Sequence, residues 1–134
     1  MFLKWRRLMT ETPPLISIVD DDLSVRRALR RLVRLAGYAV ESFGAAPEFL
    51  ASVPGGRSAC LVLDIHLDES GMSGFDLRER LAADGVAIPI IFITAHDNAA
   101  TRERVRQSGV AGFLTKPFGD QALLDLIRRE TCPA

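Results

Sequence analysis

Five consecutive apolar residues, 59–63, run directly into the carboxylate of Asp64. Such a run is too short for a helix and predicts a strand buried on both faces, as in a parallel sheet. The polar segment 65–74 follows. An acid at the last position of a buried parallel strand is expected in the crevice outside the carboxyl ends of the strands, where open α/β sheets bind ligands. Taken alone, Asp64 is better explained as a helix cap or a loop acid, so its interpretation depends on how the other strands end.

Strand-like and helix-like segments alternate five times along the chain. Strands are predicted at residues 15–19, 38–43, 59–64, 88–93 and 111–114. Helices are predicted at residues 23–36, 45–53, 74–84 and 98–108, and in a last segment that Asp120 caps and that carries Leu123, Leu124, Leu126 and Ile127. This alternation predicts an α/β fold, with helices on both faces of a parallel sheet and right-handed crossovers. The expected fold is a doubly wound five-stranded parallel sheet of order 2-1-3-4-5, flanked by five helices.

The composition excludes several classes of protein. A chain of 134 residues, 48% hydrophobic and 25% charged, is expected to form one domain with a substantial core. Its zero net charge does not favour direct nucleic-acid binding or a membrane-binding surface. No apolar run approaches the roughly 20 residues of a transmembrane helix, and residues 1–7 lack the apolar stretch of a signal peptide. We therefore expect a cytoplasmic protein in which Cys60 and Cys132 are not paired.

The two ends of the chain differ from the alternating part. Residues 1–12 precede Pro13 and Pro14 and are expected to form a flexible N-terminal extension outside the core, so that the domain occupies residues 13–134. Only four residues, 131–134, follow the last predicted helix, so we expect no output domain within these 134 residues. The chain is expected to be either a stand-alone protein or a fragment of a longer one.

The predicted sheet collects polar side chains at the carboxyl ends of four strands: Asp20, Asp21, Asp22, Asp64, Thr94 and Lys116. Four carboxylates in one pocket repel one another and favour binding of a cation. Oxygen ligands without His or Cys suit a hard cation, and a small open site suits Mg²⁺ with several waters retained. Lys116 adds a positive charge and Thr94 a hydroxyl donor. These groups fit phosphoryl transfer to a carboxylate, with Asp64 central enough to be the nucleophile.

The sequence resembles the receiver domain of two-component response regulators, most closely the receivers that precede a DNA-binding domain in FixJ-type regulators. The resemblance covers about residues 14–131 and depends on five blocks in order: Ile18-Val19-Asp20-Asp21-Asp22, Leu63-Asp64, Met72-Ser73-Gly74, Ile93-Thr94-Ala95 and Phe113-Leu114-Thr115-Lys116-Pro117-Phe118. It implies a flavodoxin-like, CheY-like fold and a phosphoacceptor signalling domain in a phosphorelay, not an enzyme. The partners implied are a sensor histidine kinase or phosphotransfer protein, a downstream protein target, and a second copy in a phosphorylation-dependent homodimer.

The resemblance also implies roles for the acids. Asp64 is the expected phosphoacceptor. Asp20 and Asp21 are expected to hold Mg²⁺ or Mn²⁺ together with Asp64, with Asp21 the more direct ligand of the pair. The backbone carbonyl of His66 is a further expected ligand.

Lys116, Thr94 and Phe113 complete the implied machinery. Lys116 is expected to contact the phosphate and to be followed by a cis peptide bond at Pro117. Thr94 and Phe113 resemble a hydroxyl–aromatic switch pair. A phosphate on Asp64 would give the Thr94 hydroxyl a new acceptor and let Phe113 rotate inward, which would bias the face formed by the helix after Thr94, the last strand and the last helix.

The loop after Asp64 departs from the family pattern. It is two residues longer than usual, with Asp68 where a proline is expected, and is predicted to be more mobile. Asp68 is expected to flank the site and tune it. His66 and His96 each lie two residues after a site residue. They are expected to flank the phosphate and to change its rate of hydrolysis between about pH 6 and 7.5. The alternative, that both are exposed loop histidines without a role, explains the pattern equally well. An unaltered decay rate and pH profile in a His66→Ala, His96→Ala variant would exclude such tuning.

The first predicted helix carries five arginines within an arc of about 140°: Arg26, Arg27, Arg30, Arg31 and Arg34. Apolar residues fill the opposite side: Val25, Leu29, Leu32, Val33 and Ala36. A solvated helix face accounts for many such patterns. Five arginines without one acid nevertheless favour a docking surface for an acidic partner, such as the kinase.

Two other classes of function remain open at this point. Asp20-Asp21-Asp22 also fits a haloacid-dehalogenase-like phosphatase, in which Asp20 would be the nucleophile and Asp22 the acid–base. No acidic pair follows Lys116 to complete such a site, because Asp120 and Asp125 are separated. A pseudo-receiver that only binds proteins is the other alternative. The position of a trapped phosphoryl group distinguishes a receiver from a phosphatase: a receiver would carry it on Asp64, and the phosphatase on Asp20.

Overall fold

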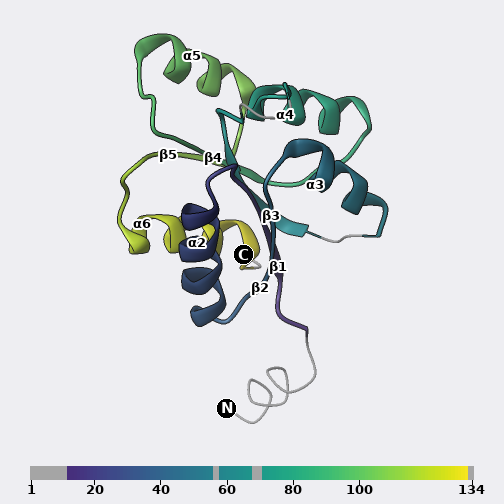
Figure 1. Cartoon of the computed structure of the whole chain (residues 1–134), viewed down its shortest axis with the longest axis vertical. Helices are drawn as coiled ribbons and strands as arrows, with labels where there is room; N and C mark the ends of the chain where they lie inside the picture. The colour runs from purple at the N-terminus through teal and green to yellow at the C-terminus, as the bar shows by residue number, and fades with distance from the viewer. Residues whose placement is uncertain (1–11, 56–57, 68–70, 133–134) are drawn as a thin grey trace.

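The computed structural model describes residues 12–55, 58–67 and 71–132 of the chain (Figure 1). Its elements are β1 (Leu15–Val19), α2 (Leu23–Leu35), β2 (Ala39–Phe43), α3 (Ala46–Ser52), the 3-10 turn η1 (Val53–Gly55), β3 (Ser58–Asp64), α4 (Gly74–Ala83), β4 (Ile90–Thr94), α5 (Ala99–Ser108), β5 (Gly112–Thr115) and α6 (Asp120–Thr131). The strands pair in parallel in the order β2-β1-β3-β4-β5. The predicted doubly wound fold is therefore confirmed. The predicted extension, residues 1–12, lies outside the described residues except for Thr12.

The helices cover both faces of the sheet, with α2 and α6 on one face and α3, α4 and α5 on the other (Figure 1). The side chains of β3 explain why its sequence is apolar without alternation. Cys60 and Val62 pack against the α2–α6 layer. Leu61 and Leu63 pack against the α3–α4–α5 layer and are fully buried. Because successive side chains of a strand point to opposite faces, a strand covered on both sides needs apolar residues at every position.

The strand register brings the site residues to one edge of the sheet. Asp64, the last residue of β3, pairs with Ile93 of β4. Thr94, the last residue of β4, pairs with Thr115 of β5. Asp20 directly follows Val19, which pairs with Leu63. Residues far apart in the sequence therefore meet at the carboxyl edge of the sheet.

Gly74 holds the start of α4 against the end of β3. Its backbone N–H donates to the carbonyl of Ile65 at 2.8 Å. A Cβ at this position would lie only 2.5 Å from the carbonyl oxygen of Asp64, so only glycine allows this approach. Ser73 and Asp76 form a capping box that starts α4 at this point. The block Met72-Ser73-Gly74 thus positions the backbone beside Asp64.

Most element boundaries differ from the sequence prediction by one or two residues, and two of these differences have a clear physical reason. The prediction that Asp120 caps the last helix is wrong: Gly119 is the N-cap, without a side-chain hydrogen bond, and Asp120 is the first helical residue. The Asp120 carboxylate lies in the first turn, where negative charge is favourable to the helix dipole. β4 begins at Ile90 and not at Ile88, because Pro89 has no N–H to donate to the sheet.

Candidate functional site

A pocket of about 190 Å³ opens at the carboxyl edge of the sheet. It is lined by Asp20, Asp21, Asp22, Asp64, His66, Ala95, His96 and Lys116. Asp20 is fully buried and Asp64 is 5% exposed. Burial of two carboxylates is costly unless cations or hydrogen bonds compensate for it.

Lys116 lies between the two buried carboxylates. Its Nζ is 2.7 Å from Oδ2 of Asp20 and 3.3 Å from Oδ2 of Asp64. The backbone N–H of Lys116 donates to the carbonyl of Thr94 at 2.7 Å, which fixes the start of this side chain to β4. The Lys116–Pro117 peptide bond is cis, as predicted.

The charge of this cluster is incompletely balanced. Burial, and then the neighbouring charge of Asp20, raise the pKa of Asp64 to about 6, although Lys116 and the His66 N–H counteract them. Burial alone would lower the pKa of Lys116, but its hydrogen bond to Asp20 and the charges of both carboxylates outweigh burial, so its pKa is raised. One lysine therefore does not fully compensate two carboxylates, and the pocket favours a second cation.

The acids have the composition and spacing of a site for a hard cation. One carboxylate oxygen from each of Asp20, Asp21 and Asp64 lies within 4.8 Å of the other two. An all-oxygen set at this spacing suits Mg²⁺, which keeps several of its waters. The raised pKa of Asp64 agrees with this assignment, because a bound cation would stabilise the ionised carboxylate. These three residues therefore fit a magnesium site.

Asp22, the fourth carboxylate predicted for the cluster, has another role. Its Oδ1 accepts hydrogen bonds from the N–H of Ser24 at 2.9 Å, of Val25 at 3.4 Å, and from the Ser24 hydroxyl at 2.6 Å. It is the N-cap of α2, and these bonds lower its pKa. All four acids line the pocket, as expected, but only Asp20, Asp21 and Asp64 bring carboxylate oxygens within 4.8 Å of one another. Asp22, the acid–base group of the phosphatase alternative, thus uses its Oδ1 to cap α2.

Thr94 and Phe113 lie on neighbouring strands behind the pocket. Thr94 is fully buried, and its Oγ1 accepts a hydrogen bond from the N–H of His96 at 3.0 Å. Phe113 is half-buried and packs against the core under α3, α4 and α5. Phe113 therefore has a packing role in the core. Its expected role in switching stays a prediction.

His66 and His96 meet at the mouth of the pocket. Their rings lie edge to face, with centroids 4.8 Å apart, and both side chains are exposed. Their sequence spacing therefore does correspond to a shared position beside Asp64. Asp68, the third residue expected to tune the site, lies outside the described residues.

Sequence reasoning missed Asp97, which connects the loop after β4 to β5. Its carboxylate accepts hydrogen bonds from Nε and Nη2 of Arg102, each at 2.6 Å, and from Oγ1 of Thr115 at 3.1 Å. The hydrogen bonds from Arg102 are the main cause that lowers the pKa of Asp97. The sequence offered only one signal for this role, an acid three residues after Thr94. The contact itself could not be predicted, because it depends on the register that brings Thr115 of β5 near Asp97.

The arginines of α2 form a basic surface of four residues, not five. Arg27, Arg30, Arg31 and Arg34 line a shallow open groove together with Leu35, which is 76% exposed. Arg26 differs, because its Nη1 donates to the backbone carbonyl of Asp20 at 2.7 Å. Arg26 therefore supports the backbone of the acidic site.

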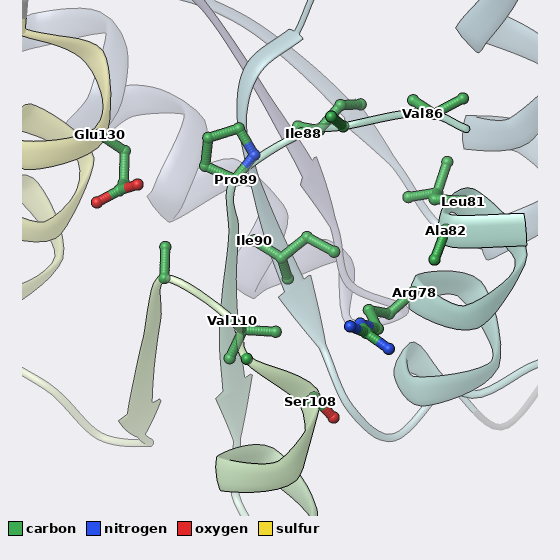
Figure 2. A pocket seen from close by; sticks show the side chains of 13 residues that line it. Arg78, Leu81, Ala82, Val86, Ile88, Pro89, Ile90, Ser108, Val110 and Glu130 are labelled. Carbon is green, nitrogen blue, oxygen red and sulfur yellow. The ribbon is translucent and has the colours of Figure 1, made fainter. Parts of the chain in front are cut away.

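A second hollow, of about 330 Å³, lies near the opposite ends of the strands (Figure 2). Figure 2 shows apolar side chains around it, among them Leu81, Val86, Ile88 and Val110. Of its charged lining residues, Arg78 and Glu130 come from different helices, α4 and α6. Its lining residues include no cluster of acids, and their one hydroxyl, that of Ser108, donates to the backbone carbonyl of Arg104. We therefore assign the chemistry to the smaller acidic pocket. None of the helices in the described ranges has the length and apolar character that a membrane span needs.

Comparisons with known proteins agree on one family. The family model described as "Response regulator receiver domain" matches residues 16–128. Nodulation protein W of Bradyrhizobium diazoefficiens is 43% identical over 116 residues, which are 87% of this chain and 50% of that protein. A solved response regulator receiver protein from Burkholderia phymatum is 39% identical, with a TM-score of 0.78, and covers 90% of this chain and 97% of its own.

The solved structure called FixJ-N is 31% identical, with a TM-score of 0.81, over 92% of this chain and 99% of its own. The chain spans about half the length of the curated relatives that it matches.

Proposed function

Because the chain belongs to the response regulator receiver domain family, we propose that Asp64 is its phosphoacceptor and that phosphorylation of Asp64 requires Mg²⁺. Such a domain is a signalling phosphoacceptor and not an enzyme in the usual sense. One observation carries the proposal. A nearly buried carboxylate, Asp64, lies beside a lysine and within reach of two further acids that can share a cation with it.

The residues account for each need of the transfer. An Asp64 oxygen attacks the phosphorus of a phosphorylated histidine or an acyl phosphate; a P–O bond to Asp64 forms, and the bond to the leaving nitrogen or oxygen breaks. The leaving group keeps the electron pair of that bond. Lys116 neutralises charge on the transferred group, and Asp20 holds Lys116 in place through the 2.7 Å contact. Mg²⁺, when held by Asp20, Asp21, Asp64 and the His66 carbonyl, would neutralise further charge on the phosphoryl oxygens.

Acetyl phosphate with Mg²⁺ tests this proposal directly. We expect the intact protein to gain the mass of one HPO₃ group, and borohydride trapping followed by peptide mapping to locate the group on Asp64. Chelation of the metal should abolish the gain. Label on Asp20 would support the phosphatase alternative. The absence of any gain, with Mg²⁺ and fresh phosphodonor, would contradict the proposal and favour a protein-binding pseudo-receiver.

The readout of phosphorylation follows from the position of Thr94. Its hydroxyl is buried behind Asp64, on the neighbouring strand, and a phosphoryl group on Asp64 would supply a new acceptor for it. Phe113 is the residue on β5 that would repack in response. The face formed by α5, β5 and α6 is then the surface whose binding of a protein target changes. His66 and His96, at the mouth of the pocket, would affect how long the phosphoryl group persists.

The basic surface of α2 supports a proposal about the phosphodonor. Receiver domains pair with histidine kinases, and the four exposed arginines suit an acidic patch on such a kinase or on a phosphotransfer protein. We expect Arg30→Glu to slow phosphotransfer from the protein donor at least tenfold and to leave the rate with acetyl phosphate unchanged. Arg80→Glu, an equal charge change on α4, is the control. Equal effects with both donors would contradict this surface.

A further inference from the structure

The loop between β4 and α5 is fastened to β5 by the side chain of Asp97. Oγ1 of Thr115 donates to Oδ2 of Asp97 at 3.1 Å, across 18 positions of sequence. Arg102, the fourth residue of α5, donates two parallel hydrogen bonds to the same carboxylate, each at 2.6 Å. Only 19% of the Asp97 side chain is exposed, against 67% for Arg102. One carboxylate thus joins a loop, a helix and a strand.

The same loop holds the hydroxyl of Thr94. Oγ1 of Thr94 accepts a hydrogen bond from the N–H of His96 at 3.0 Å, within the loop. The carbonyl of Thr94 accepts from the N–H of Lys116 at 2.7 Å. The loop therefore has one backbone connection to β5 at its beginning and one side-chain connection, through Asp97 and Thr115, near its end. A shift of residues 95–98 relative to β5 has to stretch the Asp97–Thr115 hydrogen bond.

We propose that Asp97 is a positioning residue that holds the β4–α5 loop in its resting arrangement, so that the conformation that responds to a phosphoryl group on Asp64 forms only when the Asp97–Thr115 contact is given up. This inference depends on the proposed function and deepens it. A ligand that favours the responding conformation has to offset the lost contact, and its apparent affinity is lower by the corresponding factor. Removal of the contact therefore raises the affinity for a phosphoryl mimic.

A second ion pair on α5 provides the contrast. Glu103 accepts hydrogen bonds from Nε and Nη2 of Arg106, in the same two-pronged geometry as Asp97 with Arg102. Both partners belong to α5, and their side chains are 50% and 74% exposed. The Glu103–Arg106 pair cannot resist a movement between the loop and β5. It serves as a matched control for the loss of an arginine–carboxylate pair.

Titration with beryllium fluoride in Mg²⁺, followed by calorimetry, tests the proposal. Beryllium fluoride adds to a carboxylate as a tetrahedral mimic of a phosphoryl group. Thr115→Val removes the hydroxyl at nearly constant volume and leaves the Asp97–Arg102 pair in place. We expect Thr115→Val and Asp97→Ala to bind the mimic about fivefold more tightly than the original protein, which is within the range for loss of one typical hydrogen bond. Thr115→Ser should restore the original affinity, and Glu103→Gln should not change it.

Each other outcome has one meaning. Affinities of Thr115→Val and Asp97→Ala equal to or weaker than that of the original protein would overturn the role of Asp97. If the original protein neither binds beryllium fluoride nor gains phosphate, the proposed function fails instead. Amide hydrogen exchange at residues 95–98 then tests the contact by itself: faster exchange in Thr115→Val than in Glu103→Gln supports it, and equal exchange refutes it.

Discussion

Asp64→Asn is expected to raise the free energy of unfolding of the metal-free protein by about 2 kcal/mol at pH 8. The pKa of Asp64 is about 6 in the folded protein, against an ordinary value of 3.8. Each pKa unit corresponds to about 1.4 kcal/mol, which sets an upper limit of about 3 kcal/mol. Solvent at the mouth of the pocket screens part of this cost. The neutral amide avoids it and keeps the size of the side chain.

The sign of the pH dependence follows from proton binding. Between about pH 4 and 6 the folded protein binds more protons at Asp64 than the unfolded chain does, so stability falls as the pH rises through this range. The gain from Asp64→Asn should therefore vanish below about pH 4 and reach its full size above about pH 7. Urea unfolding in EDTA at several pH values measures it. Asp125→Asn, the same change at an exposed position of α6, is the control.

The same substitution separates stability from function. Asp64→Asn should gain no phosphate from acetyl phosphate, and Mg²⁺ should stabilise it less than it stabilises the original protein, because one of the three carboxylates is gone. A variant that is more stable and yet inert to phosphodonors would indicate that the acidic pocket is retained at a cost in stability. A variant that is destabilised at pH 8, or that still gains phosphate, would contradict the role of Asp64.

Much of this site could be predicted because its residues lie at the ends of strands. The apolar residues of β3 required burial on both faces, and that requirement fixed the parallel sheet and placed Asp64 at its carboxyl edge. The strand order then brought Asp20, Thr94 and Lys116 to the same edge. Strand ends depend on backbone pairing, which hydrophobic patterns determine well.

The direction of individual side chains was less predictable. Asp20, Asp21 and Asp22 are identical in type, yet Asp22 turns to the N–H groups of α2 while Asp20 turns to Lys116. Which acid caps the helix depends on the residue at which α2 begins, a boundary that sequence patterns locate only within a few residues. Asp97 was missed for a different reason, because its contact with Thr115 exists only in the observed register of β4 and β5.

The second large effect is expected from Lys116→Met. The substitution keeps the length of the side chain and removes the cation that lies 2.7 Å from Asp20 and 3.3 Å from Asp64. Asp20 is fully buried, and the side chain of Asp64 is only 7% exposed. Removal of one partner from a buried ion pair typically costs about 3–5 kcal/mol, since the remaining charge stays desolvated. We expect the free energy of unfolding in EDTA at pH 8 to fall by about 3 kcal/mol.

Two conditions should reduce this loss, and both follow from the charge of the pocket. At about pH 5 Asp64 takes up a proton, so less negative charge remains without compensation and the variant should approach the original protein. Saturating Mg²⁺ should also recover part of the loss, because Asp20, Asp21 and Asp64 can share the cation. Arg80→Met, which breaks the exposed Arg80–Asp84 pair on α4, should change stability by less than about 0.5 kcal/mol. A loss of stability in Lys116→Met that depends on neither pH nor Mg²⁺ would mean that Lys116 contributes through packing alone. It would also mean that the pocket does not need Mg²⁺ as a second cation, and the proposed phosphorylation depends on that cation.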